Sequence, residues 1–384
     1  MTLRDSGRSD PARGTFVTVS TPLVERLLEP PSYGFSRAGT LYKPSTRELL
    51  LEFCTRLDVV RNRKNWVAFV CWLATLALAV PLVVFAARYF SWVLLGVAFA
   101  YAMIVLGTHG TVYLHRYSTH RAYVFSSPVA RFLCAHAVIK IVPEELYVVS
   151  HHVHHKLSDR PGDPYNAEGG FLYCFLADAN HQPIARDLSE SDYRRASKLL
   201  AHTGVRRNSY AQYQRWGSIA HPVRTVIGIV LNWAFWYAAF FAMGGHALAT
   251  ALFGASFVWG VGVRTFNYGA HGSGKDARRP GLDFSDGDRS INQLFRGLVS
   301  GEWHSNHHLY PRSARAGFLR WQLDTAWLAI RAMAAVGVVK SYRDDRAKFL
   351  GEHYEPRPLV SNGTCGAAPL PPHRGGAPAV RQSG

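Results

Sequence analysis

Three clusters of histidine hold the side chains of this sequence that could do chemistry. They are His115 with His120, then His151, His152, His154 and His155, and then His304, His307 and His308. Their spacings are HxxxxH, HxxHH and HxxHH. Neutral imidazole suits borderline ions such as iron, zinc and copper. These spacings supply at least eight ligands, more than the four that one tetrahedral zinc uses, so the clusters indicate two metal ions.

Helical geometry predicts which imidazoles of a cluster point the same way. Residues i, i+3 and i+4 share one face of a helix, so His151, His154 and His155 face together, and so do those of the third cluster. His152 lies off that face, and we interpret it as a supporting or surface residue. His115 and His120 are about 140° apart on an ideal α-helix, which predicts that they face different parts of the site.

Further candidates lie beside the clusters. In Asn267-Tyr-Gly-Ala-His271 the two polar residues are one helical turn apart, and we expect His271 to be a ligand and Asn267 to hold a metal-bound water. A metal-bound imidazole usually donates its other N–H to a carboxylate or a carbonyl. Acids close to the clusters are the candidate acceptors: Asp163 and Glu302, with Glu144 and Glu145 as weaker ones. The cations that flank the clusters would contact phosphates or anchor the chain at the membrane: Arg116, Arg121 and Lys156.

Long apolar segments surround the clusters and must position them. They run over residues 65–87, 92–114, 223–243 and 247–266. Each reaches the length of about 20 residues that a membrane-spanning helix needs. The sequence therefore predicts an all-α integral membrane protein with four transmembrane helices. Lys and Arg are sparse in the turns inside each pair of segments and abundant elsewhere, which predicts that both termini and the middle segment are cytoplasmic.

This topology brings all three clusters to one face of the membrane, because an even number of crossings separates them. One segment threatens that parity: residues 128–143 are apolar on balance, but the segment is short and contains Arg131, His136 and Lys140. We interpret it as an interfacial or re-entrant helix. If it crossed the membrane, the first two clusters would lie on opposite sides.

The remaining composition limits the class of protein. The formal charge of +17 over 384 residues suits an anionic membrane surface, and no nucleic-acid-binding motif accompanies it. The five cysteines form no CxxC pair, which argues against a disulfide framework and for a reducing compartment. We expect no cleavable signal peptide, a partly disordered cytosolic segment over 1–60, a membrane domain over 61–349 and a disordered tail over 350–384. The cytosolic cap of the membrane domain would come from 115–222 and 267–349.

At this point the chain resembles the membrane fatty acid desaturases, the histidine-box enzymes with two irons, and among them the acyl-CoA desaturases. The matching segments are His115-Arg-Tyr-Ser-Thr-His120-Arg121, His151-x-x-His154-His155-Lys156, Asp163-Pro-Tyr-Asn166, Asn267-x-x-x-His271 and Gly301-Glu302-Trp-His304-Ser-Asn-His307-His308-x-Tyr310-Pro311. With the four apolar segments, the resemblance covers about residues 60–330. It implies a mushroom-like fold of four transmembrane helices below a helical cytosolic cap that holds the irons.

The resemblance also implies a ligand set and a reaction. The ligands would be His115, His120, His151, His154, His155, His271, His304, His307 and His308, with Asn267 acting through water. The reaction would use O2 to remove two hydrogens from adjacent methylenes of a long fatty acyl chain and leave a cis double bond. A buried tunnel would hold that chain, and Tyr101, Trp259, Phe266 and Tyr268 are candidates for its lining. A separate protein, of the ferredoxin or cytochrome b5 type, would deliver the electrons, because the tail carries no fused cytochrome b5 motif.

Several alternatives stay open at this level. The Ser-His-x-Gly-Trp segment of well-known acyl-CoA desaturases is missing after the second cluster, so the acyl carrier could be CoA, a membrane lipid or a carrier protein. Box spacing does not separate a desaturase from a hydroxylase, a ketolase or a related oxygenase. A membrane zinc hydrolase or a non-catalytic metal protein is a lesser alternative, because the sequence contains no HExxH pair.

Overall fold

The computed structural model describes residues 22–181, 183–271, 303–320 and 322–353. The chain divides into two units, residues 1–346 and 347–384. Most of the described residues are helical, as predicted. The longer helices in chain order are α1 (Thr46–Leu57), α2 (Trp66–Ala77), α3 (Ala79–Val84), α4 (Trp92–Ala100), α6 (Pro128–Ala135), α7 (Glu144–Leu157), α10 (Glu190–Ser197), α11 (Tyr210–Trp216), α12 (Pro222–Gly262), α14 (His304–Leu309), α15 (Thr325–Ala335) and α16 (Arg346–His353).

Short helical pieces connect or continue these helices. They are η1 (Leu23–Glu25), η2 (Arg63–Asn65), η3 (Phe85–Tyr89), η4 (Tyr101–Leu106), α5 (Gly107–His109), η5 (Gly110–Thr119), η6 (Ala167–Gly169), α8 (Phe171–Phe175), α9 (Ala177–Asn180), η7 (Lys198–Leu200), η8 (Val263–Thr265) and α13 (Phe266–Ala270). The pieces η3, η4 and η5 are π-helical.

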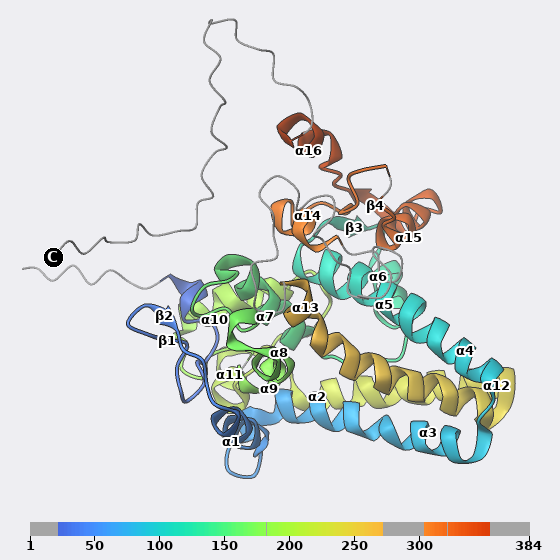
Figure 1. The fold of residues 1–384 in the computed structure, drawn as a ribbon, viewed down its shortest axis with the longest axis horizontal. Helices are drawn as coiled ribbons and strands as arrows, with labels where there is room; N and C mark the ends of the chain where they lie inside the picture. Colours follow the sequence, from blue (N-terminus) through green and yellow to red (C-terminus); the bar gives the residue numbers. More distant parts are fainter. Residues whose placement is uncertain (1–21, 182, 272–302, 321, 354–384) are drawn as a thin grey trace, which may run out of the picture. The chain divides into compact units, whose positions relative to one another are not determined.

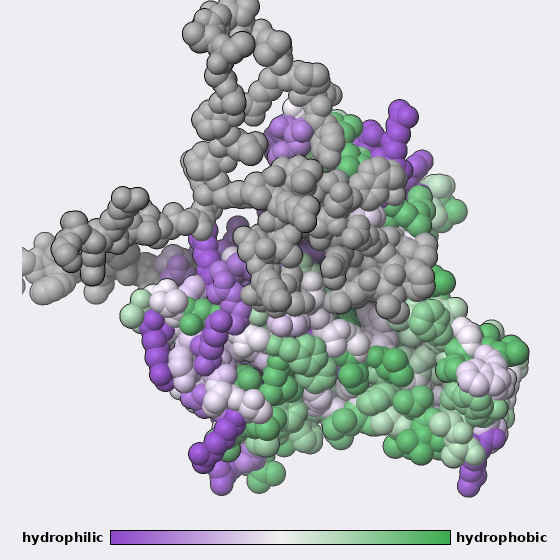
Figure 2. All heavy atoms as spheres, viewed as in Figure 1, coloured by the Kyte–Doolittle hydropathy of each residue, from purple (hydrophilic) through white to green (hydrophobic). Residues whose placement is uncertain are grey.

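Among the described residues, three helical segments are long and apolar enough to cross a membrane: Arg63–Tyr89, Trp92–Thr119 and Pro222–Thr265. The first two contain the predicted spans 65–87 and 92–114, and the third contains nearly all of the other two. Their surfaces expose large apolar side chains, among them Leu76, Val83 and Trp92. A helix that is apolar all round and not covered by protein is typical of a membrane span. Figure 2 shows apolar residues gathered over the face that α2, α3 and α12 form.

The helix α12 is broken near its middle by two glycines. Gly244 and Gly245 have non-helical backbone angles, and the φ of Gly245 is +65°. That left-handed conformation favours glycine, because glycine has no Cβ to clash with the backbone. In Figure 1 the chain turns back at this point, so that the two halves of α12 lie beside each other. The break falls in the predicted turn between residues 243 and 247.

Two short antiparallel sheets depart from the all-α prediction. One pairs β1 (Ser36–Arg37) with β2 (Thr40–Leu41), and the other pairs β3 (Tyr123–Phe125) with β4 (Val339–Tyr342). The second sheet joins the chain that follows His120 to the chain that follows α15. The residues between 128 and 143 contain only the eight-residue helix α6, which is too short to cross a membrane.

The helix α7 shows how the fold positions a histidine cluster. Its first turn carries Glu144 and Glu145, which favour a helix N-terminus. One face buries Val149 and Val153 in an apolar core with Ile184, Leu200 and Ile219. Residues on the other face, including His151 and His155, are therefore directed away from that core and towards η5 and α14.

Candidate metal centre

Four elements bring the predicted ligands together. The segment η5 contains His115 and is followed directly by His120, while α7 supplies the second cluster. His271 directly follows α13, and α14 contains the third cluster. The imidazoles form two groups, His115, His120, His151, His155 and His307 in one and His154, His271, His304 and His308 in the other. Within each group the candidate ligand nitrogens all lie within 4.8 Å of one another.

The distances between ring nitrogens suit a shared ion. In the group of five, Nε2 of His155 lies 3.1 Å from Nε2 of His151 and 3.0 Å from Nε2 of His307. In the group of four, Nε2 of His304 lies 2.9 Å from Nε2 of His271 and 3.0 Å from Nε2 of His308. Two nitrogen ligands at right angles, each about 2.1 Å from an ion, would be about 3.0 Å apart. The observed spacings have that size.

Hydrogen bonding alone does not satisfy these clusters. One neutral imidazole nitrogen carries either a proton or a lone pair, so Nε2 of His304 makes at most one N–H···N bond with its two neighbours. Nε2 of His120 and of His154 are buried without a hydrogen-bond partner among the described residues. Leaving a buried polar atom unpaired costs about 1–3 kcal/mol. The donor set therefore fits a pair of metal ions.

The two groups adjoin each other through His155 and His308. Their rings are stacked, with centroids 4.3 Å apart and an interplanar angle of 20°. Because His154 and His155 are neighbours on α7 but belong to different groups, the helix itself fixes the separation of the two sites. Such an arrangement would hold two ions side by side.

A π-helix explains why His115 and His120 belong to one group. The prediction that they face different parts of the site, based on an ideal α-helix, is wrong. The segment η5 has i→i+5 bonding, and the backbone N–H of His120 donates to the carbonyl of His115 at 3.2 Å. Residues five apart therefore lie over one another, and the two ring centroids are 5.0 Å apart.

Two carboxylates fix the orientation of imidazoles in the group of four. Oδ1 of Asp163 lies 2.8 Å from Nδ1 of His154, and neither side chain is exposed. Oδ1 of Asp159 lies 3.2 Å from Nδ1 of His271. Each carboxylate contacts Nδ1, so that Nε2 of the same ring points into the group of four. A carboxylate usually orients a metal-binding histidine in this way. Asp163 was predicted, whereas Asp159 was missed, although it stands only four residues after His155.

Burial keeps the clustered imidazoles neutral. The pKa lies well below its ordinary value for His120, His151, His155, His304, His307 and His308. The main cause is loss of hydration on burial, followed by repulsion from the neighbouring imidazoles. The neutral form is the one that binds a metal, so the folded chain presents ligands that need not lose a proton first.

An apolar cavity adjoins the group of five. It has a volume of about 80 Å³, and its lining includes His115, Leu114, Tyr147, Trp259 and Phe266. Arg264 and Asp178, which also line this cavity, form an ion pair at 2.8 Å. Of the predicted tunnel residues, Trp259 and Phe266 line this cavity. Tyr101 packs against Phe240 and Tyr268 against Phe171, and neither lines it.

The predicted phosphate contacts differ in their surroundings. Arg116 is fully buried, and both oxygens of Asp324 accept from its Nη2 at 3.0 Å. The prediction that Arg116 contacts substrate phosphates is therefore wrong, since its guanidinium is enclosed by protein. Arg121 donates to the carbonyl of Lys198 at 2.8 Å, and Lys156 is exposed. Asn267 lies on α13 one turn before His271, whereas Glu302 lies outside the described residues.

Comparison with known proteins places this geometry in a family. The fatty acid desaturase family model matches residues 90–341. An icosanoyl-CoA 5-desaturase of Limnanthes douglasii is 26% identical over 87% of this chain and 88% of its own length. An acyl-CoA C20 Delta5-desaturase of Anemone leveillei is 31% identical over 67% of this chain and 76% of its own length. An sn-1 stearoyl-lipid 9-desaturase of Synechocystis is 25% identical over 69% and 76%.

The family match runs through the apolar segments after residue 90 and through all three histidine clusters. The matched range 90–341 contains every imidazole of the two groups, both carboxylates and Trp259. The chain therefore belongs to the membrane fatty acid desaturase family and is an oxidoreductase that desaturates fatty acyl chains.

Proposed function

We propose that the protein uses O2 and external electrons to introduce a cis double bond into a long acyl chain at a centre of two irons. The observation that carries this proposal is the grouping of nine imidazoles into sets of five and four. Imidazole binds iron, zinc and copper, but five nitrogen donors in one group exceed the tetrahedral set of zinc. The ligands would be the five and four residues of the two groups, with Asn267 acting through water and with Asp163 and Glu302 as supporting acids.

The overall reaction balances as a four-electron reduction of O2. The two hydrogen atoms removed from adjacent methylenes supply two electrons and two protons, another two electrons and two protons come from outside, and the products are an alkene and two waters. The irons, when bound, supply the reduction of O2 and the cleavage of the C–H bonds. The chain itself supplies position, because the apolar cavity beside His115 would hold a featureless hydrocarbon against the centre and exclude water.

The topology that we propose has four membrane crossings. The break at Gly244 and Gly245 would divide α12 into a third and a fourth span, so that His115 and His304 emerge on the same side. Basic residues are abundant outside the two inter-helix turns, and the positive-inside rule then puts both termini, the cap and the active site in the cytoplasm.

The electrons would come from a separate carrier of the ferredoxin or cytochrome b5 type. The formal charge of +17 would favour the approach of an acidic protein by electrostatic steering. The substrate would be a fatty acyl group on CoA, a membrane lipid or a carrier protein. The relatives include desaturases named for acyl-CoA substrates and one named for a stearoyl-lipid.

Substitution of one imidazole in each group tests the centre. We expect His154→Ala and His307→Ala to abolish unsaturated product in a host that expresses the full chain, while the exposed His353→Ala keeps it. The purified wild-type chain should contain about two irons, in keeping with two closed sets of nitrogen donors. Retained activity in either variant of the groups would overturn the ligand assignment.

The same experiment separates the alternatives. Mass spectrometry of the host lipids would show a loss of two mass units for a desaturase. A gain of oxygen would instead identify a hydroxylase, ketolase or related oxygenase on the same scaffold. One zinc per chain with no change in the lipids would identify a membrane hydrolase or a non-catalytic metal protein.

A further inference from the structure

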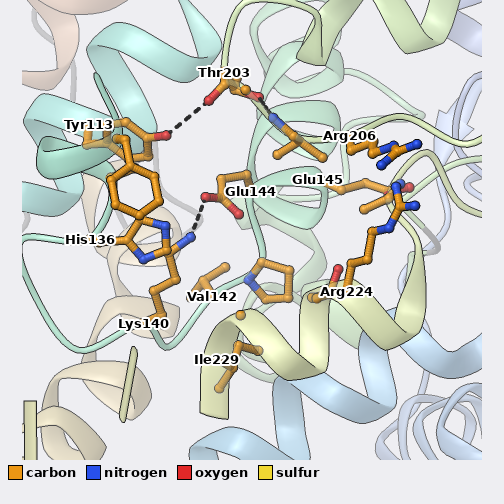
Figure 3. Close-up of a pocket in the computed structure, with 18 of the residues that line it drawn as sticks. Tyr113, His136, Lys140, Val142, Glu144, Glu145, Thr203, Arg206, Arg224 and Ile229 are labelled. Carbon is orange, nitrogen blue, oxygen red and sulfur yellow. Dashed lines mark hydrogen bonds and ion pairs between the residues drawn. The ribbon is translucent and has the colours of Figure 1, made fainter. Parts of the chain in front are cut away.

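A second cavity, larger than the one beside His115, opens on the other side of η5. Its volume is about 230 Å³. It lies between α6, the start of α7, the loop of residues 203–206 and the start of α12 (Figure 3). Its ionisable lining residues are Arg131, His136, Lys140, Glu144, Glu145, Arg206, His221 and Arg224. We call this cavity the basic pocket.

The acids of the basic pocket are already engaged. Glu144 pairs with Lys140 at 2.9 Å. The two oxygens of Glu145 accept the backbone N–H groups of Ile219 and Ala220, each at 2.7 Å. Burial also raises the pKa of Glu145 to about 7, which lowers its negative charge at neutral pH. The arginines of the pocket are therefore not neutralised by these two acids.

Three guanidinium groups surround the pocket. Within the described ranges, no ion pair joins Arg131, Arg206 or Arg224 to a carboxylate. Figure 3 shows Arg206 and Arg224 on the same side of the pocket, opposite Tyr113 and His136. Arginine presents a fork of N–H donors that matches the oxygens of a phosphate.

The side chain of Arg131 packs against a glycine in the loop of residues 203–206. Its guanidinium lies against Gly204, where an added Cβ would be 2.7 Å from Nη2 of Arg131. Gly204 has a φ of +87°, a backbone conformation that residues other than glycine rarely adopt. Glycine at this position therefore makes room for the cation at the wall of the pocket.

A small third cavity lies between the basic pocket and the cavity beside His115. This third cavity, of about 30 Å³, shares Tyr113, Ala135 and Val142 with the basic pocket. The same cavity shares Gly110, Leu114 and Trp259 with the cavity beside His115. The three cavities thus follow one another from the arginines to the group of five.

The basic pocket also borders the apolar surface. The helix α6 exposes Val129, Phe132 and Leu133, and Phe132 itself lines the pocket. Gly228 and Ile229, which also line it, lie inside the third candidate span. A ligand could therefore enter from the membrane, with its charged group held where the span begins.

From these observations we propose that the basic pocket binds the phosphate of a membrane glycerophospholipid, whose acyl chain extends through the neighbouring cavities to the centre. This inference rests on the proposed function, and it selects a lipid as the acyl carrier. In a glycerophospholipid only a glycerol unit separates the phosphate from the acyl ester. In acyl-CoA the whole pantetheine arm separates them. The pocket that the arginines line shares Tyr113, Ala135 and Val142 with the small cavity that adjoins the one beside His115, so the short linker fits.

Binding measured without turnover tests the proposal. The purified full chain in detergent is titrated by calorimetry with a diether phosphatidylglycerol, with the same diether glycerol lacking phosphate and with an alkyl-CoA thioether. We expect the Arg206→Gln/Arg224→Gln variant to bind the phosphate-bearing lipid at least about tenfold more weakly, since each charge-assisted hydrogen bond contributes more than a neutral one. Its affinity for the phosphate-free lipid should not change.

Matched variants and the third ligand make each outcome decisive. Arg47→Gln, on the exposed surface of α1, should bind all three ligands as the wild type does, and both variants should keep the wild-type thermal transition. Unchanged affinity of the double variant for phosphatidylglycerol would overturn the proposal. A loss confined to the CoA thioether would also overturn it and assign the pocket to CoA. Because binding needs neither O2 nor electrons, these results do not depend on whether the proposed reaction is correct.

Discussion

The carboxylate of Asp163 contacts Nδ1 of His154 at 2.8 Å, and both side chains are fully buried. Asp163 also accepts the backbone N–H groups of Asp159 and Tyr165, at 3.0 and 2.9 Å. The loop that follows α7 is therefore folded around the same carboxylate that orients the imidazole. Folding of this loop and the geometry of the proposed iron site are coupled through one side chain.

Replacing Asp163 by Asn should weaken the metal centre. The amide keeps the size of the carboxylate but removes its charge, and loss of such a supporting acid typically costs about 10- to 100-fold in metal affinity or activity. Iron content after dialysis against a chelator, together with the rate of desaturation, measures the effect. The exposed Asp187→Asn serves as the matched control, and equal iron retention by the two variants would contradict the assigned role.

The Asp159→Asn variant should show a smaller loss than Asp163→Asn. The side chain of Asp159 is 33% exposed, and its contact with His271 is longer, at 3.2 Å. Solvent screens a partly exposed charge, so its interaction is weaker. Its φ of +59° is also tolerated by asparagine, so the backbone should not change. The same chelator dialysis ranks the two variants, and a greater loss for Asp159→Asn would reverse the order of importance that the geometry assigns.

Arg116→Gln should destabilise the fold without changing substrate affinity. Arg116 contacts both oxygens of Asp324, which in turn accepts the backbone N–H groups of Ala316 and Trp327 at 2.7 and 2.8 Å. Removing one partner of a buried ion pair costs about 3–5 kcal/mol, because the other charge stays buried and unpaired. Denaturant unfolding measures this loss. A raised KM of the folded fraction would instead support the phosphate contact predicted from sequence.

The sequence was sufficient to predict which imidazoles come together but not every local geometry. The spacing HxxHH already places three imidazoles on one face, and α7 and α14 keep that geometry. The prediction that His115 and His120 face different parts of the site was wrong, because no residue pattern distinguished the π-helix of η5 from an α-helix. Arg116 was misassigned for a related reason, since its partner Asp324 lies far along the chain. Contacts of that kind are set by the tertiary fold and leave no local signal.

Gly110 and Trp259 should control the width of the cavity beside His115. A Cβ at Gly110 would lie 3.0 Å from Cζ2 of Trp259, so Gly110→Ala should displace the indole. A shift of about 1 Å at a reacting centre costs on the order of a hundredfold in rate, and we expect a loss of about 10- to 100-fold. Trp259→Leu should widen the cavity and change the chain-length profile of the products. Gas chromatography of the host lipids measures the amount of product made by Gly110→Ala and the chain lengths of the products made by Trp259→Leu. Identical chain-length profiles for the wild type and Trp259→Leu would exclude the indole from the substrate path.

His181 should make the folded chain sensitive to acid. Burial lowers the pKa of His181 to about 3, whereas an unfolded histidine titrates near 6.5. Between these values the unfolded chain binds a proton that the folded chain does not, so this group reduces stability as the pH falls below about 6.5. At pH 5 the loss is about 2 kcal/mol, at 1.36 kcal/mol for each pH unit.

The variant His181→Phe isolates this contribution. The ring of His181 stacks on Phe35 with centroids 5.3 Å apart and packs beside Tyr173, so a phenyl ring suits the site. Unfolding free energies at pH 7 and pH 5 are compared for the wild type and for the variant. Any packing cost of the substitution changes the unfolding free energy equally at pH 7 and at pH 5. It therefore cancels when the two free energies are subtracted. We expect the variant to lose about 2 kcal/mol less between pH 7 and pH 5, and an equal loss would mean that the buried His181 accepts a proton in the folded chain.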